Sequence, residues 1–300
     1  MRTHLVAALA SHLVSGLEPL EASRWRAVRD ALACAPEDAS PDWLRENLEP
    51  SDFEAVSDRL DRLDDYVEAL SLWESRGVQA LTEFDGAYPR AWRERLGGKA
   101  SSLVFVSGEE AVLNCESVGI VGSRHVDELG SSFAESAARS AAESGLAVVS
   151  GGAKGVDSLA MRAAFQAGGT VLGVLADSLG KAPNDREVEA MLESGRLALV
   201  SPNSPDAPFT VGNAMGRNKL IYAHSQGTLV VSSSLEEGGT WAGAVEALKL
   251  GLGPVLVRMD DDAPEGNRAL ASRGAIAVER PDGFWLASEG RSATQPGLFA

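Results

Sequence analysis

The 300-residue chain has little cysteine and no long apolar run. Its two cysteines, Cys34 and Cys115, are too few for a disulfide scaffold or a multi-cysteine zinc site, which fits a reducing compartment. No apolar run approaches the roughly 20 residues that a membrane-spanning helix needs. A secretory signal is not visible either, because His4, Ser11 and His12 interrupt the N-terminal apolar stretch. We therefore expect a cytoplasmic protein that does not associate with a membrane.

Basic residues are also scarce relative to acidic ones. The chain has 27 lysines and arginines against 43 aspartates and glutamates, a net charge of −16. This balance excludes a surface that coats nucleic acid non-specifically, because phosphate affinity comes largely from basic side chains. Residues 1–80 hold half of the acidic excess, with 8 basic and 16 acidic side chains. A local basic groove elsewhere in the chain therefore remains open.

The first 80 residues have helical periodicity. Leucines recur every fourth residue near the N-terminus, and Ser40-Pro41-Asp42 is typical of a helix start. The acidic stretch 52–68 is either a solvated helix face, or a docking surface for a basic partner or an oligomer contact. We therefore assign residues 1–80 to an acidic, all-helical region.

From residue 117 onward, short apolar runs alternate with helical stretches. The expected strands are 118–121, 146–149, 170–175, 197–200, 228–231, 254–257 and 275–278, and the expected helices are 129–144, 156–167, 185–194, 215–224 and 240–250. Apolar strands separated by helices predict an α/β fold, a Rossmann-like doubly wound sheet that is mainly parallel. We assign this domain to residues 81–280 and a flexible tail to 281–300.

Two glycine-rich motifs follow the first two of these strands. Residues 119–124 read GIVGSR and residues 150–157 read SGGAKGVD. Glycines there allow tight turns and close approach of a ligand, and the helix that follows favours an anion. A three-glycine dinucleotide fingerprint and a Walker A motif are both missing, which argues against NAD and excludes P-loop ATP hydrolysis. No histidine pair, catalytic triad or nucleophile elbow is present, so we expect no metal, no cofactor and no catalytic residue.

The ordered motifs resemble those of the DprA (Smf) family of DNA-processing proteins. Residues 121–124 match its VGSR signature, residues 150–157 its SGxAxGxD motif, and residues 217–219 its RNR-type helix start. Tyr88-Pro89 and the strand 103–108 resemble its entry segment. The resemblance covers roughly residues 83–280. It implies a homodimer that binds single-stranded DNA in uptake, recombination or defence against foreign DNA, and that loads the recombinase RecA.

The resemblance also implies a set of binding residues. Four basic side chains would hold successive phosphates in one groove: Arg124, Lys154, Arg217 and Lys219. The Asn218 side chain and backbone amides of two loops, at Gly122, Ser123, Gly151 and Gly152, would add neutral donors. The alternative is that Arg124 and Arg217 pair with Asp157 or Asp177 and brace the loops.

Departures from the family pattern limit what can be carried over. Ala182-Pro183-Asn184 stands where the family has Tyr-Pro-Asn, so one aromatic platform for a base is missing. Phe209 either replaces it or lies in the core. About 20 residues follow Gly283, too few for the winged helix of many members, which puts RecA loading in doubt.

The last glycine motif departs further. The sequence Gly238-Gly239-Thr240 replaces the family's Ser-Gly-Ser element, and at a helix start it forms a phosphate cradle. It resembles a loop of the LOG branch of the superfamily, which binds nucleoside monophosphates and cleaves their N-glycosidic bond. That branch has its glutamate closer to the threonine than Glu246. The alternative function is thus a LOG-like nucleotide sensor or nucleoside 5′-monophosphate phosphoribohydrolase, and we favour binding without catalysis.

The C-terminal residues hold one more motif. Gln295, Leu298 and Phe299 resemble the Gln-x-x-Leu-Phe peptide that replication and repair proteins insert into the DNA sliding clamp. The alternative is that Leu298 and Phe299 pack on the protein's own surface. The sequence therefore predicts four partners: single-stranded DNA, a second copy of the chain, RecA and the sliding clamp.

Overall fold

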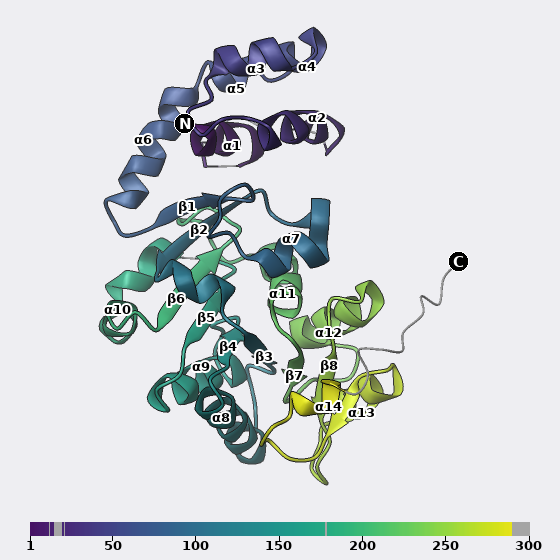
Figure 1. Ribbon diagram of the computed structural model, residues 1–300. Helices are drawn as coiled ribbons and strands as arrows, with labels where there is room; N and C mark the ends of the chain where they lie inside the picture. The colour runs from purple at the N-terminus through teal and green to yellow at the C-terminus, as the bar shows by residue number, and fades with distance from the viewer. Residues whose placement is uncertain (12, 15–19, 21, 178, 290–300) are drawn as a thin grey trace.

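The computed structural model describes residues 1–11, 13–14, 20, 22–177 and 179–289. A set of N-terminal helices lies above one end of a twisted sheet, and further helices cover both sides of that sheet (Figure 1). The order of the nine strands found among the described residues is β1-β2-β6-β5-β4-β3-β7-β8-β9. Strands β3 to β9 pair in parallel, whereas β1 and β2 form an antiparallel extension beside β6.

The N-terminal region is helical, as its periodicity predicts. Its helices are α1 (Arg2–Ala10), α2 (Ala22–Ala33), α3 (Pro41–Asn47), α4 (Pro50–Glu54), α5 (Ser57–Leu60) and α6 (Leu63–Glu74). The expected start at Ser40 is confirmed, because its side chain accepts a hydrogen bond from the Trp43 backbone N–H at 3.3 Å and Pro41 occupies the first turn.

The remainder alternates strands and helices. The strands are β1 (Gln79–Thr82), β2 (Leu103–Gly108), β3 (Ser117–Val121), β4 (Ala147–Ser150), β5 (Val171–Val174), β6 (Leu197–Ser201), β7 (Thr228–Val230), β8 (Val255–Arg258) and β9 (Ile276–Val278). The helices are α7 (Arg90–Leu96), α8 (Glu128–Glu143), α9 (Val156–Gln166), α10 (Arg186–Glu193), α11 (Val211–His224), α12 (Gly238–Leu250), α13 (Glu265–Ser272) and α14 (Leu286–Glu289), with 3-10 turns η1 (Gly97–Lys99), η2 (Glu110–Asn114) and η3 (Leu179–Asn184). The predicted Rossmann-like α/β class is confirmed.

Successive strand residues face opposite sides of the sheet and build two cores. In β6, Leu197 and Leu199 join the core beneath α8 and α9, whereas Ala198 and Val200 join the core beneath α7, α11 and α12. In Figure 1 these two groups of helices lie on opposite sides of the sheet. Both sides of the parallel strands are thus covered, which explains their near-continuous apolar sequence.

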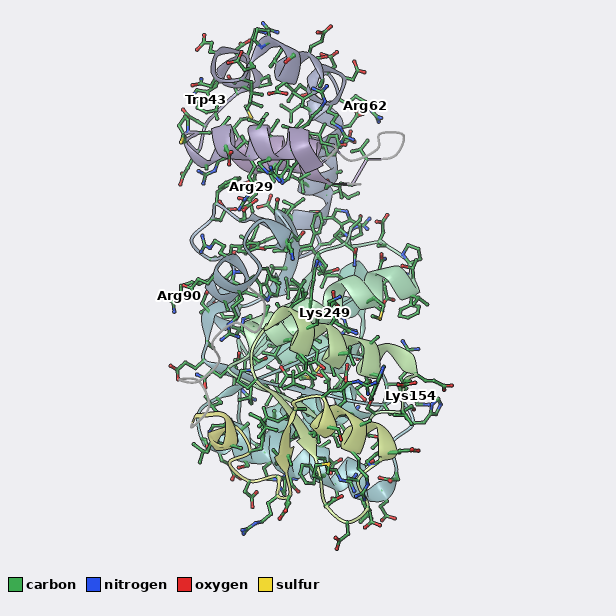
Figure 2. All side chains as sticks on the ribbon, turned by 90° about the vertical axis from the view of Figure 1, so that its right-hand side faces the viewer. Arg29, Trp43, Arg62, Arg90, Lys154 and Lys249 are labelled. Atoms are coloured by element: carbon green, nitrogen blue, oxygen red, sulfur yellow. The ribbon has the colours of Figure 1, made fainter. Side chains whose placement is uncertain are left out.

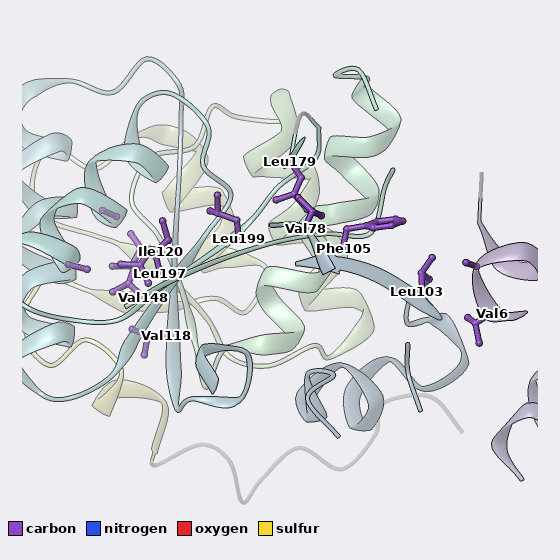
Figure 3. Packing of buried hydrophobic residues seen from close by; sticks show 14 of the residues in the cluster. Val6, Val78, Leu103, Phe105, Val118, Ile120, Val148, Leu179, Leu197 and Leu199 are labelled. Atoms are coloured by element: carbon purple, nitrogen blue, oxygen red, sulfur yellow. The ribbon is translucent and has the colours of Figure 1, made fainter. Parts of the chain in front are cut away.

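The N-terminal helices share a core with the sheet through β2. Figure 3 shows Leu103 and Phe105 of β2 between Val6 of α1 and the central strands, in one continuous row of apolar side chains. At the same junction, Arg29 donates from Nε to Glu83 at 2.8 Å. The N-terminal region is therefore packed on the sheet edge.

Packed structure continues past residue 280. Phe284 is 2% exposed and makes an edge-to-face contact with Trp285 before α14. The predicted clamp residues Gln295, Leu298 and Phe299 lie outside the described residues. Among the described helices, we find none with the length and apolar character needed to cross a membrane.

Candidate nucleic-acid interface

The chain reverses its direction of travel across the sheet between β3 and β7. From β3 it continues through β4, β5 and β6 on one side, and then crosses to β7, β8 and β9 on the other. Ligands of doubly wound sheets bind outside the carboxyl ends of the strands at such a switch point. A cavity of about 640 Å³ lies there. The residues that line it include Gly122, Ser123, Arg124, Asp157, Phe209, Arg217, Asn218, Tyr222, Glu237, Gly238, Gly239 and Thr240.

The first two glycine motifs hold this end of the sheet together. A Cβ at Gly122 would lie 2.6 Å from the Val156 side chain, so glycine lets the loop after β3 pack on the start of α9. Gly155 has φ +92° and lies against the carbonyls of Ser123 and Arg124. Gly122 and Ser123 reach the cavity, whereas Gly151 and Gly152 are not among its lining residues.

Arg217 and Asp157 face each other at the base of the cavity. Their exposed fractions are only 6% and 5%. A Cβ at Gly151 would overlap the Arg217 guanidinium, and the Gly151 N–H donates to Asp157 Oδ2 at 3.2 Å. Burial raises the pKa of the Asp157 carboxyl, and the positive charge of Arg217 partly counteracts this rise. Burial lowers the pKa of Arg217, and the negative charges of Asp157 and Asp177 partly counteract that fall. The two buried charges therefore interact electrostatically, but no ion pair or hydrogen bond joins them among the described residues, and Arg217 also lines the cavity.

An arginine and an aromatic ring form one rim of the cavity. Arg124 is exposed, and its Cζ lies 5.0 Å from the centroid of the Phe209 ring. Phe209 is 47% exposed, so it lies on the cavity wall rather than in the core. A cation over a half-exposed ring presents both a charge and a flat apolar face to a ligand.

The N-terminus of α12 forms the opposite wall. Gly238, Gly239 and Thr240 line the cavity, and the N-cap residue Glu237 makes no side-chain capping hydrogen bond. The Glu237 side chain thus leaves the first-turn N–H groups of α12 uncapped. Free N–H groups at a helix N-terminus favour the binding of an anion. The preceding loop is held by Arg273, which donates to Glu236 Oε1 at 3.0 Å.

The predicted basic side chains do not all reach the cavity. Asn218 lines it and donates from Nδ2 to the Gly239 carbonyl at 3.1 Å, bracing α12. Lys219 lines a separate hollow instead. Lys154 lies on the outer surface of the α/β part (Figure 2) and lines neither. Of the five predicted side chains, the structure brings together Arg124, Arg217 and Asn218.

Tyr222 is a site residue that the sequence analysis missed. It lines the cavity, yet it is almost wholly buried and its hydroxyl has no hydrogen-bond partner among the described residues. Burial raises its pKa, so the hydroxyl stays protonated at neutral pH. Its position four residues after Asn218, on the same face of α11, was the available signal.

His224, by contrast, has a structural role. Its Nδ1 lies 2.8 Å from Ser117 Oγ and its Nε2 lies 2.9 Å from the Leu113 carbonyl oxygen. Burial lowers its pKa to about 4, so the ring is neutral at pH 7. It lies away from the cavity and joins α11 to the start of β3.

Comparisons with known proteins agree with this fold. The chain is 31% identical over 188 residues to protein Smf of Escherichia coli, an alignment that covers 60% of this chain and 49% of that protein. It is 25% identical over 184 residues to DNA processing protein DprA of Bacillus subtilis, covering 61% of each. The chain thus spans about half to three fifths of the length of these relatives.

Two solved structures share the fold. DNA processing protein A from Streptococcus pneumoniae superposes with a TM-score of 0.72 at 21% identity, covering 94% of this chain and 95% of that one. A second structure concerns the single-stranded DNA binding mode of DNA processing protein A from Helicobacter pylori. It superposes with a TM-score of 0.56 at 20% identity, covering 70% of this chain and 94% of that one. The family model for DNA recombination-mediator protein A matches residues 79–287. With its motifs in order around one cavity, this chain belongs to the DNA recombination-mediator protein A (DprA/Smf) family.

Proposed function

We propose that this chain binds single-stranded DNA in the cavity at the switch point, without turning it over chemically. The observation that carries the proposal is the exposed Arg124 guanidinium over the half-exposed Phe209 ring, in the cavity that the N-terminus of α12 also lines. Proteins that bind single strands combine cationic side chains with aromatic faces on which bases stack. The H. pylori protein, whose structure concerns its binding of single-stranded DNA, supports the same ligand class.

Each wall of the cavity has a separate task in this proposal. The first turn of α12 receives a phosphate, because its N–H groups and helix dipole favour negative charge. Phe209 receives a base, and Arg124 neutralises the neighbouring phosphate. The buried Arg217 adds positive potential, which the charge of Asp157 partly offsets.

The test is binding of a fluorescent oligo-dT, followed by anisotropy, for wild type, Arg124→Gln and Phe209→Ala. Stacking on one aromatic side chain contributes about 1–3 kcal/mol per base, so we expect Phe209→Ala to weaken binding by roughly 5- to 150-fold. Arg124→Gln removes the charge beside it and is expected to weaken binding and its salt dependence together.

The matched control is Lys249→Gln, which removes an exposed positive charge at the far end of α12. It should bind like wild type. Equal affinity of wild type, Arg124→Gln and Phe209→Ala would contradict the proposed site, and absence of binding by wild type at low salt would contradict the function itself.

The LOG-like alternative lacks a comparable observation. Glu246 is not among the residues that line the cavity, and the glutamate that does line it, Glu237, precedes Thr240 rather than following it. Tight binding of a nucleoside monophosphate that oligo-dT cannot displace would reopen it.

The predicted protein partners remain proposals. We propose self-association as a homodimer, handover of the strand to RecA, and clamp binding through Gln295, Leu298 and Phe299. Light scattering of the whole chain tests the first, and RecA filament assembly on protein-bound oligo-dT tests the second. Titration of a peptide of residues 288–300 against sliding clamp tests the third, and no saturable binding would refute it.

A further inference from the structure

A second hollow, of about 210 Å³, lies on the opposite flank of α11. The residues that line it are Lys99, Ser101, Pro202, Asn203, Gly212, Asn213, Gly216, Arg217, Lys219 and Leu220. At about 100° per residue, the α11 residues in the cavity and those in this hollow fall on opposite faces of the helix. Arg217 is the residue common to both linings, so its side chain lies between the two hollows.

The charge of this hollow contrasts with the acidic chain around it. Neither the Lys99 nor the Lys219 ammonium group forms an ion pair with a carboxylate of the described residues. Helix α11 contains no acidic residue, in a protein of net charge −16. Arg217 is 6% exposed, and its Nε has no hydrogen-bond partner within the described part of the chain.

Two glycines of α11 also line this hollow. A Cβ at Gly216 would meet nothing within 4 Å, and one at Gly212 would meet only Thr210 Oγ1 at 3.8 Å. Glycine inside a helix is less stable than alanine, and packing does not require it at either position. The open backbone leaves room for another chain to lie close against α11.

We propose that the hollow is a second binding subsite for the same single strand that occupies the cavity. The strand passes around the exposed first turn of α11 and lies against Gly212 and Gly216. One phosphate binds between Lys99 and Lys219, near the unpartnered Nε of Arg217. This inference rests on the proposed function and adds to it the route by which the strand continues beyond the cavity.

The experiment compares a short oligo-dT of about 4 nucleotides, sufficient for the cavity, with a long one of about 15. The variants are Lys99→Gln/Lys219→Gln and Gly216→Leu, which fills the hollow, with Lys249→Gln as control. For the long strand, the slope of log affinity against log salt should fall in magnitude by about 0.7 for each neutralised phosphate that is lost, and so by about 0.7 for the one phosphate between the two lysines. Gly216→Leu should weaken binding of the long strand about 10-fold with a melting temperature no lower than that of wild type. Binding of the short strand should stay at the wild-type level in all variants.

Several results would overturn the subsite. One is an unchanged slope and affinity for the long strand in the double lysine variant. Another is an equal loss for the short and long strands, which would place the lysines at the cavity. If Arg124→Gln loses binding while Lys99→Gln/Lys219→Gln does not, the proposed function is supported and the second subsite is refuted. If wild type binds neither strand, the proposed function and the second subsite are both refuted.

Discussion

Replacing Arg217 with methionine removes the positive charge that faces the buried Asp157 carboxylate. Both side chains are nearly inaccessible, at 6% and 5% exposed. The two groups form no direct ion pair among the described residues, but their opposite charges interact through the buried interior. Leaving one buried charge without its compensating partner costs about 3–5 kcal/mol. The Gly151 N–H still donates to Asp157 at 3.2 Å, so we expect a loss near the lower limit, about 3 kcal/mol.

The loss is measurable as a lowered melting temperature. At about 2.1 cal/mol/K per residue, the unfolding entropy of 300 residues is about 0.6 kcal/mol/K. The melting temperature should therefore fall by about 5 °C in calorimetry near neutral pH. Burial already raises the pKa of Asp157 above its ordinary value of 3.8, so on acidification the folded state binds this proton before the unfolded state does. The destabilisation caused by Arg217→Met should therefore shrink as the pH falls towards 3.8.

The double variant Arg217→Met/Asp157→Asn decides whether the two charges are coupled. If they are, removing both should recover most of the loss seen for Arg217→Met alone. Losses that simply add, or an Arg217→Met protein that melts like wild type, would refute the buried-pair interpretation. The same reasoning makes Arg124 a better probe of DNA binding than Arg217, because its side chain is exposed.

Three further predictions concern stability. Gly216→Ala should stabilise the protein by about 0.5–1 kcal/mol in urea unfolding, since its Cβ enters open space; destabilisation would mean that the space is filled. The pKa of His224 is lowered to about 4 in the folded protein, against an ordinary value of 6.5. On acidification the unfolded state therefore binds this proton before the folded state does, and about 2 kcal/mol of stability should be lost between pH 7 and about pH 5. His224→Gln should lack that part of the pH dependence, and an identical pH profile would contradict the assignment. Arg29→Met leaves the buried Glu83 carboxylate without its cation, which should cost about 1–3 kcal/mol of stability. Limited proteolysis should then cleave the chain faster between α6 and β1. An unchanged cleavage rate would show that the ion pair does not hold the N-terminal helices against the sheet.

The central strands were predictable because both of their faces are buried. Runs such as 118–121 are almost wholly apolar, and β3 occupies Ser117–Val121. Strand β1 (Gln79–Thr82) was not foreseen, because it is a short edge strand with only two buried residues. Helix α11 begins at Val211 rather than at the predicted residue 215. Thr210 caps it there, accepting a hydrogen bond from the Asn213 N–H at 2.9 Å.

The motifs of the site could be predicted from the sequence, but the spatial arrangement of its side chains could not. The motifs place Arg124, Arg217 and Lys219 near one edge of the sheet, but they do not say which flank of α11 each side chain takes. The burial of Arg217 depends on Asp157, sixty positions earlier in the sequence, and on the missing Cβ of Gly151. The contact of Phe209 with Arg124 joins two loops that no sequence spacing connects.

The most direct test of the central claim is photocrosslinking of an oligo-dT that carries 5-iodouracil to the whole protein. Mass spectrometry then identifies the attached peptide. The account predicts crosslinks to the segment that contains Phe209, and their loss in Phe209→Ala while Lys249→Gln retains them. Crosslinks confined to helices α1 to α6, or unchanged by Phe209→Ala, would contradict it.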